Sequence, residues 1–151
     1  MIPQSGRHAL RAVVELAGLQ AGRYEGVGAL ARRTGAPANY LGKLLQVLVG
    51  SGVLESRKGP GGGFRLARPA AEITLLDIVE PLADLAGWNE CILGLPVCSD
   101  ETACRIHGTW DEMRSSYMRM LSGTILADLI IARDPGPEGR QPTKARTGGD
   151  R

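Results

Sequence analysis

The chain is poor in aromatic residues and in histidine, and it lacks any long apolar run. One Phe, three Tyr and two Trp among 151 residues predict a core of aliphatic side chains. With only two histidines and no nucleophile–base pair, phosphate-binding P-loop or dinucleotide fingerprint, the sequence argues against an enzyme. No stretch approaches the roughly 18 apolar residues of a membrane-spanning helix. Residues 1–6 carry no apolar signal, so we expect a cytoplasmic protein.

A fourth cysteine is also missing, which argues against a closed disulfide framework. The three that are present, Cys91, Cys98 and Cys104, fall within fourteen residues, and His107 follows closely. Such crowded soft donors favour thiolate ligation of an iron–sulfur cluster with a fourth ligand from elsewhere. Structural zinc on the three thiolates and His107 is a second reading, although zinc sites usually have tighter cysteine spacing. A third interpretation is that the cysteines form a thiol switch. A fourth is that they are three unrelated buried residues.

Charge is sorted along the chain. Residues 1–70 hold ten Lys or Arg and three Asp or Glu, whereas residues 71–132 hold three and ten. The first segment is therefore a basic module of the kind that meets nucleic-acid phosphates. The second would be repelled by them and must have another role.

The basic segment also carries the pattern of a winged helix-turn-helix. Apolar spacing predicts helices over residues 5–20, 27–34 and 37–49, with a tight turn at 34–36 between the last two. Two short strands, 53–57 and 64–67, joined by a glycine-rich connection at 58–63, predict a hairpin wing. A plain flexible turn at 58–63 is the alternative. We expect a mainly α fold with a small β-hairpin wing, and residues 1–70 as a DNA-binding domain.

Residues 71–132 are expected to form the sensor loop and dimerisation helices. Thr74 and Asp77 have the spacing of a capping box, which predicts a helix start. Residues 87–106 are predicted to be a loop. A single long helix is predicted over 108–132, and its apolar seam near a coiled-coil period favours dimerisation. Residues 133–151 contain no core-forming side chains, so we expect a disordered tail.

Contacts with DNA can be ranked by position. The first two turns of the helix predicted over 37–49, the second helix of the helix-turn-helix, are expected to face base edges. Asn39 can then pair with adenine, Lys43 with guanine or a phosphate, and Tyr40 with a phosphate. Arginines and lysines outside this helix are expected to contact the DNA backbone, and glycines at the wing tip let the wing approach that backbone closely. The complete predicted set is Arg32, Arg33, Ala38, Asn39, Tyr40, Lys43, Arg57, Lys58, Gly61, Gly62 and Arg65.

Three stretches resemble the IscR/NsrR (Rrf-type) family of winged-helix bacterial transcription regulators, within a likeness that covers about residues 1–132. They are Leu30-Ala31-Arg32-Arg33-Thr34-Gly35, the wing Arg57-Lys58-Gly59-Pro60-Gly61-Gly62-Gly63-Phe64-Arg65-Leu66, and the cysteine loop. The resemblance implies a homodimer on a palindromic operator. It also implies a [2Fe–2S] or [4Fe–4S] cluster on Cys91, Cys98 and Cys104, with His107, or His8 on the first helix, as fourth ligand. The first cysteine interval has six residues where one branch of the family has five, so the type of cluster stays open.

The sequence thus predicts a dimeric repressor of transcription. A cluster that responds to iron–sulfur or iron supply, nitric oxide or redox state would control its affinity for double-stranded DNA. The alternative is a winged-helix regulator without a cluster, which switches by cysteine oxidation or by binding zinc.

Overall fold

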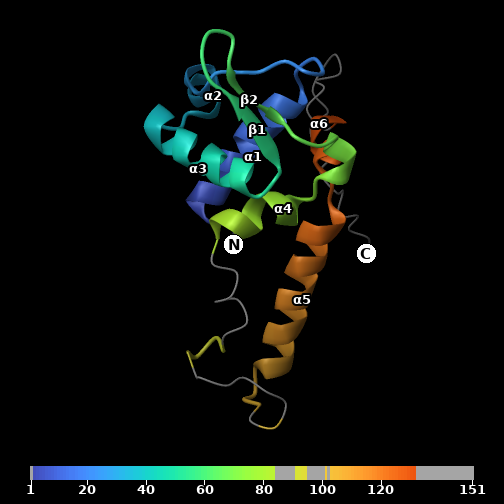
Figure 1. Ribbon diagram of the computed structural model, residues 1–151. Helices are drawn as coiled ribbons and strands as arrows, with labels where there is room; N and C mark the ends of the chain where they lie inside the picture. The colour runs from blue at the N-terminus through green and yellow to red at the C-terminus, as the bar shows by residue number, and fades with distance from the viewer. Residues whose placement is uncertain (1, 84–90, 95–100, 102, 132–151) are drawn as a thin grey trace, which may run out of the picture.

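The structure is a computed structural model that describes residues 2–83, 91–94, 101 and 103–131. Its helices are α1 (Gln4–Ala17), α2 (Val27–Thr34), α3 (Ala38–Gly50), α4 (Leu75–Val79), α5 (His107–Gly123) and α6 (Leu126–Ile131). Its strands are β1 (Leu54–Arg57) and β2 (Gly63–Leu66), and two short 3₁₀ turns are η1 (Ala70–Glu72) and η2 (Glu80–Leu82). Figure 1 shows that α5 extends away from the group formed by α1–α4, the strands and α6.

The predicted helix-turn-helix is confirmed. The second helix, α2, ends at Thr34 because Gly35 adopts a left-handed conformation with φ 69°, and its N–H donates to the carbonyl of Ala31 at 2.9 Å. Pro37 then precedes α3 as its extended N-cap residue. The first helix, α1, ends at Ala17, three residues before the predicted end, and places Ala9, Val13 and Leu16 in the core.

The predicted wing is also confirmed. Strands β1 and β2 pair antiparallel, with Leu54 opposite Leu66 and Arg57 opposite Gly63. A third segment, which the sequence pattern did not reveal, joins them. Glu25 and Phe64 exchange both of their backbone hydrogen bonds at 2.9 Å, so the chain before α2 extends the small sheet at one residue.

The core is aliphatic, as the composition predicts, and it crosses the boundary predicted at residue 70. Leu126 of α6 and Ile78 of α4 are fully buried in the same cluster as residues of α1 and α3. A second, smaller cluster joins Leu75 and Val79 of α4 to Leu121 of α5. The acidic segment therefore packs directly on the basic one, and α4 contacts both α1 and α5.

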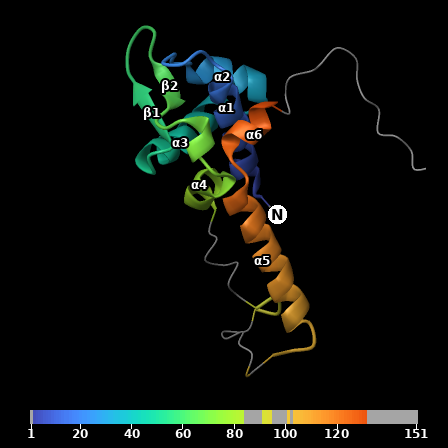
Figure 2. The same cartoon turned by 90° about the vertical axis from the view of Figure 1, so that its right-hand side faces the viewer.

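The prediction of one helix over 108–132 is wrong. Helix α5 ends at Gly123, Thr124 and Ile125 are not helical, and α6 begins at Leu126. The break arises because these residues pair with the chain before α4: the Leu75 N–H donates to the Thr124 carbonyl at 3.0 Å, and the Leu126 N–H donates to the Ile73 carbonyl at 2.8 Å. Beyond the break α6 lies against α1 (Figure 2). The spacing of apolar residues could not reveal this break, because the helical period of the apolar residues continues across the two interrupting positions.

The predicted cysteine loop is described only at residues 91–94, 101 and 103–106, where the structure has no α-helix or β-strand. Cys98 and the predicted disordered tail 133–151 lie outside the described residues. Among the described helices, none combines the length and the apolar character needed to cross a membrane.

Candidate nucleic-acid interface and cysteine site

The exposed face of α3 lines an open hollow of about 450 Å³. Asn39, Lys43 and Gln46 lie at helical spacing along it, and Gly42 sits among them. Val27 of α2 and Phe64 of β2 complete the hollow, so it lies where α3 meets the wing. The structure therefore brings Asn39 and Lys43 together as predicted. It adds Gln46, seven residues after Asn39, which the same helical spacing could have identified.

Tyr40 differs from its neighbours on α3 because its ring also contacts α1. Tyr40 is 41% exposed, and its ring meets the His8 ring edge-on, with 6.1 Å between the centroids. His8 is half-buried and lies 3.5 Å from the amide nitrogen of Gln4, Nε2 to Nε2. Its Nδ1 is buried and finds no hydrogen-bond partner among the residues that the structure describes. Within one chain, the alternative fourth ligand His8 thus contacts the predicted recognition helix.

The two predicted phosphate contacts on α2 have different surroundings. Arg32 is exposed and makes no ion pair with any described carboxylate. Arg33 lies 3.2 Å from Glu25 and 4.0 Å from Glu15, N to O. The charge of Arg33 is therefore already paired within the protein, which leaves Arg32 as the predicted phosphate contact on α2 with the more available charge.

The predicted wing contacts also separate into two kinds. Arg57, Lys58 and Gly61 are exposed, whereas Arg65 is half-buried and makes an ion pair with Glu55. The hydrogen bond with Glu55 raises the pKa of Arg65 above its ordinary value. Arg57 and Arg65 share one neighbour that sequence reasoning missed: the ring of Tyr24, with each guanidinium carbon 4.5 Å from the ring centroid.

The backbone conformation of the wing itself explains why glycines are needed there. Gly59, Gly61 and Gly63 have positive φ of 88°, 72° and 132°. A Cβ on Gly62 would lie 2.2 Å from the carbonyl oxygen of Arg57, and one on Gly63 would lie 2.1 Å from that of Glu25. The hairpin itself therefore requires these residues, whether or not the tip touches DNA.

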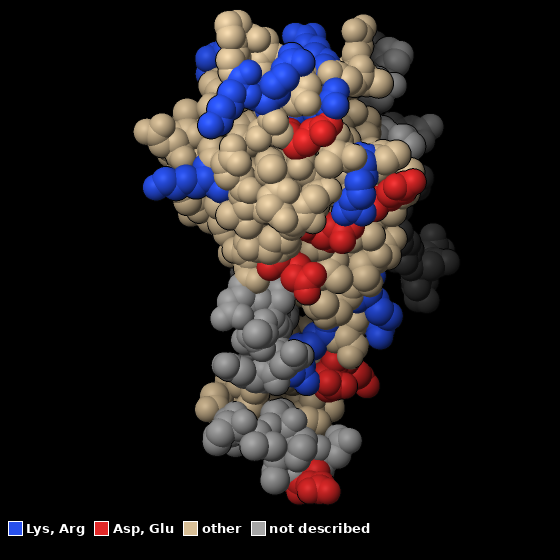
Figure 3. All heavy atoms as spheres, viewed as in Figure 1, with Lys and Arg blue, Asp and Glu red and all other residues tan. Residues whose placement is uncertain are grey.

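Charge on the molecular surface follows the fold. In the space-filling view, Lys and Arg gather over the wing and the neighbouring helices, whereas Asp and Glu lie mostly lower, toward α4 and α5 (Figure 3). The concentration of positive charge over the wing and α2, with Lys43 on the adjacent α3, is the arrangement expected for a surface that meets phosphates.

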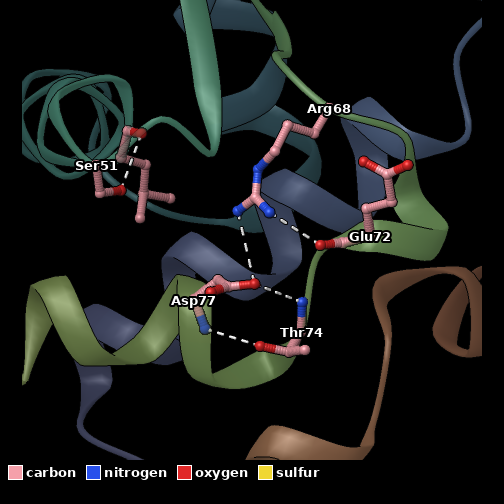
Figure 4. Close-up of polar contacts among 6 residues, drawn as sticks. Ser51, Arg68, Glu72, Thr74 and Asp77 are labelled. Carbon is pink, nitrogen blue, oxygen red and sulfur yellow. Dashed lines mark hydrogen bonds and ion pairs between the residues drawn. The ribbon is translucent and has the colours of Figure 1, made fainter.

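The wing is joined to α4 by a polar network (Figure 4). Thr74 and Asp77 form the predicted capping box: the Thr74 N–H donates to Asp77 at 2.9 Å, and the Asp77 N–H donates to the Thr74 hydroxyl at 3.1 Å. Arg68 donates to the Glu72 carbonyl at 2.9 Å and lies 3.5 Å from Asp77. Partial burial alone would raise the pKa of Asp77, but these hydrogen bonds and the Arg68 charge lower it below its usual value.

The cysteine site is remote from the wing. In both ribbon views residues 91–94 lie near the first turns of α5, at the end farthest from the strands (Figures 1 and 2). Cys91 is buried and Cys104 is half-buried. The His107 N–H donates to the Cys104 carbonyl at 3.0 Å, so these two predicted ligands share one turn at the start of α5. Among the described residues, no three His, Cys, Asp or Glu side chains group closely enough to hold a metal ion.

The fold and the basic α3–wing surface define a winged helix-turn-helix DNA-binding protein. Comparison with known proteins specifies the class further. Residues 2–132 match the model of the Rrf2 family, described as an iron-dependent transcriptional regulator, and the chain belongs to that family. This confirms the resemblance seen in the sequence, and it identifies the protein as a DNA-binding transcriptional regulator rather than an enzyme.

Individual relatives agree with this assignment. A protein of Aquifex aeolicus named as an HTH-type transcriptional regulator is 36% identical over 126 residues, 82% of this chain and 87% of the relative. Protein rrf2 of Nitratidesulfovibrio vulgaris is 34% identical over 101 residues, 67% of each chain. Among solved structures, CymR, the global cysteine regulator of B. subtilis, has a TM-score of 0.74 at 25% identity, covering 89% of this chain and 98% of CymR. IscR of T. potens has a TM-score of 0.72 at 23% identity, covering 93% of each chain, and supports the fold.

Proposed function

We propose that this Rrf2-type regulator is a homodimeric repressor that binds a palindromic operator, with α3 in the major groove and the wing against the backbone. The observation that carries the DNA-binding part is the α3 hollow, where Asn39 and Lys43 lie together on an exposed face beside the wing. Asn39 presents the amide that pairs with adenine, and Lys43 a donor for guanine or a phosphate. Arg32, Arg57 and Lys58 are exposed basic residues nearby that can contact phosphates.

Dimerisation through α5 is supported by the apolar side chains that this helix exposes. Met113 and Met120 are 49% and 47% exposed and are separated by seven residues, so they lie along the same side of α5. Exposed apolar side chains in a row favour burial against a partner. A second copy, related by a twofold axis, would place two recognition helices at successive turns of DNA.

We also propose that Cys91, Cys98, Cys104 and a fourth ligand hold an iron–sulfur cluster. The donor set fits: three thiolates are soft ligands, the His107 imidazole is a nitrogen ligand that also suits iron, and Cys104 and His107 already share a turn. When bound, such a group supplies a centre that responds to iron supply, oxidants or nitric oxide. His107 is the proposed fourth ligand, and His8 is its alternative.

The path from this site to the reading surface runs through packed elements. His107 begins α5, Leu121 of α5 packs on Leu75 and Val79 of α4, and Asp77 of α4 makes an ion pair with Arg68, two residues after the wing strand β2. To regulate, a change at the cysteine site need alter DNA affinity only about 10–100-fold, which corresponds to roughly 1.4–2.7 kcal/mol of coupling.

A second candidate mechanism is favoured by the likeness to B. subtilis CymR, a global cysteine regulator. In this reading the same dimer binds DNA without a cluster and switches by oxidation of its thiols or by binding zinc. Both mechanisms place the switch in the cysteine loop. They differ in whether the thiols hold a cluster, hold zinc or become oxidised.

One experiment separates these mechanisms. The wild type, Cys98→Ala and the neighbouring control Ser99→Ala would be purified anaerobically and compared by absorption spectrum, iron, sulfide and zinc content, and thiol count. The cluster proposal expects visible absorption with iron and sulfide in the wild type and in Ser99→Ala, and their loss in Cys98→Ala. A colourless wild type with no iron or sulfide contradicts the cluster, and zinc content or oxidisable thiols then identify the alternative.

A further inference from the structure

Tyr24 lies outside both the recognition helix and the wing strands, yet it contacts the two wing arginines. The segment that carries it is held firmly, because the next residue, Glu25, exchanges two backbone hydrogen bonds of 2.9 Å with Phe64 of β2. The ring is half-buried and lies 4.5 Å from the guanidinium carbons of both Arg57 and Arg65. Two cations on one aromatic ring need a reason, because they repel one another and each could be solvated alone.

The two arginines differ in how much of their hydrogen-bonding capacity the protein already uses. Arg65 stands directly opposite Glu55 in the hairpin and bonds to it through Nε, and its Nη1 donates to the Gly22 carbonyl at 3.2 Å. Its charge is thus paired and two of its five N–H donors are bonded within the protein. Arg65 acts as an anchor that ties the Tyr24 segment to β1 and β2.

Arg57 retains most of its donors. Its Nη2 donates to the Gly61 carbonyl at 3.0 Å, and it makes no ion pair with any described carboxylate. It lies two residues from Glu55 along β1, so its side chain projects from the same face as the Glu55–Arg65 pair. A guanidinium held over an aromatic ring, on an exposed side chain that retains most of its donors, is preorganised to bind a phosphate.

We propose that Tyr24 is a positioning residue for DNA binding: it holds the Arg57 guanidinium for a backbone phosphate, while Arg65 fixes the ring and does not itself contact DNA. This inference rests on the proposed function, because it assumes that the wing approaches DNA. It revises the predicted contact set by removing Arg65 and by assigning to Tyr24 a role that acts through Arg57.

The test uses sequence-independent binding, because a phosphate contact strengthens binding to all sequences alike. A fluorescent duplex of arbitrary sequence, about 30 base pairs long to hold two half-sites one turn apart, would be titrated at several salt concentrations. We expect Tyr24→Leu to weaken binding about tenfold for each protomer on the duplex, the scale of one hydrogen-bonded charged group, and to lower the salt slope by about 0.9 for each phosphate that is no longer neutralised. Tyr24→Phe keeps the ring and should behave as wild type.

A double-mutant cycle distinguishes positioning from general support of the wing. If Tyr24 acts through Arg57, then Tyr24→Leu should cause little further loss in an Arg57→Ala background. It should add fully to Arg32→Ala, the control on α2. Arg57→Lys keeps the positive charge but cannot stack a planar group on the ring, so it should fall between wild type and Arg57→Ala. Because Arg57 is exposed, this variant also reports on the proposal if Tyr24→Leu unfolds.

The outcomes divide clearly. Equal losses from Tyr24→Leu with and without Arg57, or Arg57→Lys binding as tightly as wild type, would overturn the positioning role. So would Arg65→Ala lowering the salt slope in a folded protein as much as Arg57→Ala does. In those cases Arg32→Ala would still weaken binding, and the proposed function would stand. If wild-type binding showed no dependence on salt, the DNA-binding proposal itself would fail.

Discussion

Gly63→Ala gives the most direct structural test of how the wing is assembled. A Cβ at this position would lie 2.1 Å from the Glu25 carbonyl oxygen and 2.8 Å from the Gly26 nitrogen, which are backbone atoms that cannot move aside without breaking the Glu25–Phe64 pairing. The φ of 132° at Gly63 is in addition strongly unfavourable for alanine. The substitution must therefore both strain the chain and displace the Tyr24 segment.

The magnitude follows from these two effects. Losing two backbone hydrogen bonds removes about 0.5–1.5 kcal/mol each, and a residue forced into this backbone region costs about 1–3 kcal/mol. We expect Gly63→Ala to lower the free energy of unfolding by about 2–6 kcal/mol, measured by urea denaturation followed by circular dichroism.

Two matched controls isolate the contributions. Gly59 also has a positive φ, of 88°, but a Cβ there meets no atom within 4 Å, so Gly59→Ala should lose only about 1–2 kcal/mol. Gly50, the last residue of α3, has open space and no positive φ, so Gly50→Ala should gain about 0.5–1 kcal/mol. If Gly63→Ala were no less stable than Gly59→Ala, the reasoning about the third segment of the wing would be refuted.

Three other expectations concern different parts of the molecule. Asp77→Ala should lower the free energy of unfolding at neutral pH by about 0.5–2 kcal/mol, since it removes the acceptor of the Thr74 N–H hydrogen bond in the capping box. Because the folded state lowers the pKa of Asp77, the ionised carboxylate contributes fully to stability above its ordinary pKa of 3.8, and this contribution is lost as pH falls through the lower folded pKa. The free energy of unfolding, measured in urea, should therefore fall less on acidification in the variant than in the wild type. Leu121→Ala removes a fully buried side chain and should cost about 2–5 kcal/mol, whereas thermal unfolding of the exposed control Ser122→Ala, the next residue of α5, should change little. Asn39→Ala should relax sequence preference in a binding selection, and Lys58→Ala should weaken all duplexes alike and lower the salt slope by about one for each protomer on the duplex. Identical selectivity in the two variants would contradict these roles.

Local signals explain why much of the fold was predictable. The α2–α3 turn is specified by Gly35 and Pro37, whose backbone preferences act within a few residues. The capping box is likewise a four-residue pattern, and it occurs where the sequence indicated. The proposed DNA-reading face follows from helical spacing once α3 is known, which is why Asn39 and Lys43 line the same hollow.

The features that sequence reasoning missed depend on contacts between distant segments. The interruption at Thr124 and Ile125 arises from pairing with residues about fifty positions earlier, and no local pattern records that pairing. Tyr24 meets Arg57 and Arg65 only because the chain before α2 joins the hairpin. The ligand set at the cysteines stays a prediction, since Cys98 lies outside the described residues.

The central claim is that the group held by the cysteine loop controls how tightly the α3–wing surface binds DNA. The most direct measurement is the dissociation constant of one anaerobic preparation for an operator duplex, selected by the wild-type protein from random sequence, before and after chelation strips the bound group. We predict a change of about 10–100-fold, and an affinity for Cys98→Ala that matches the stripped protein. Equal affinities in all three states would contradict the account and leave a DNA-binding protein whose cysteines do not regulate it.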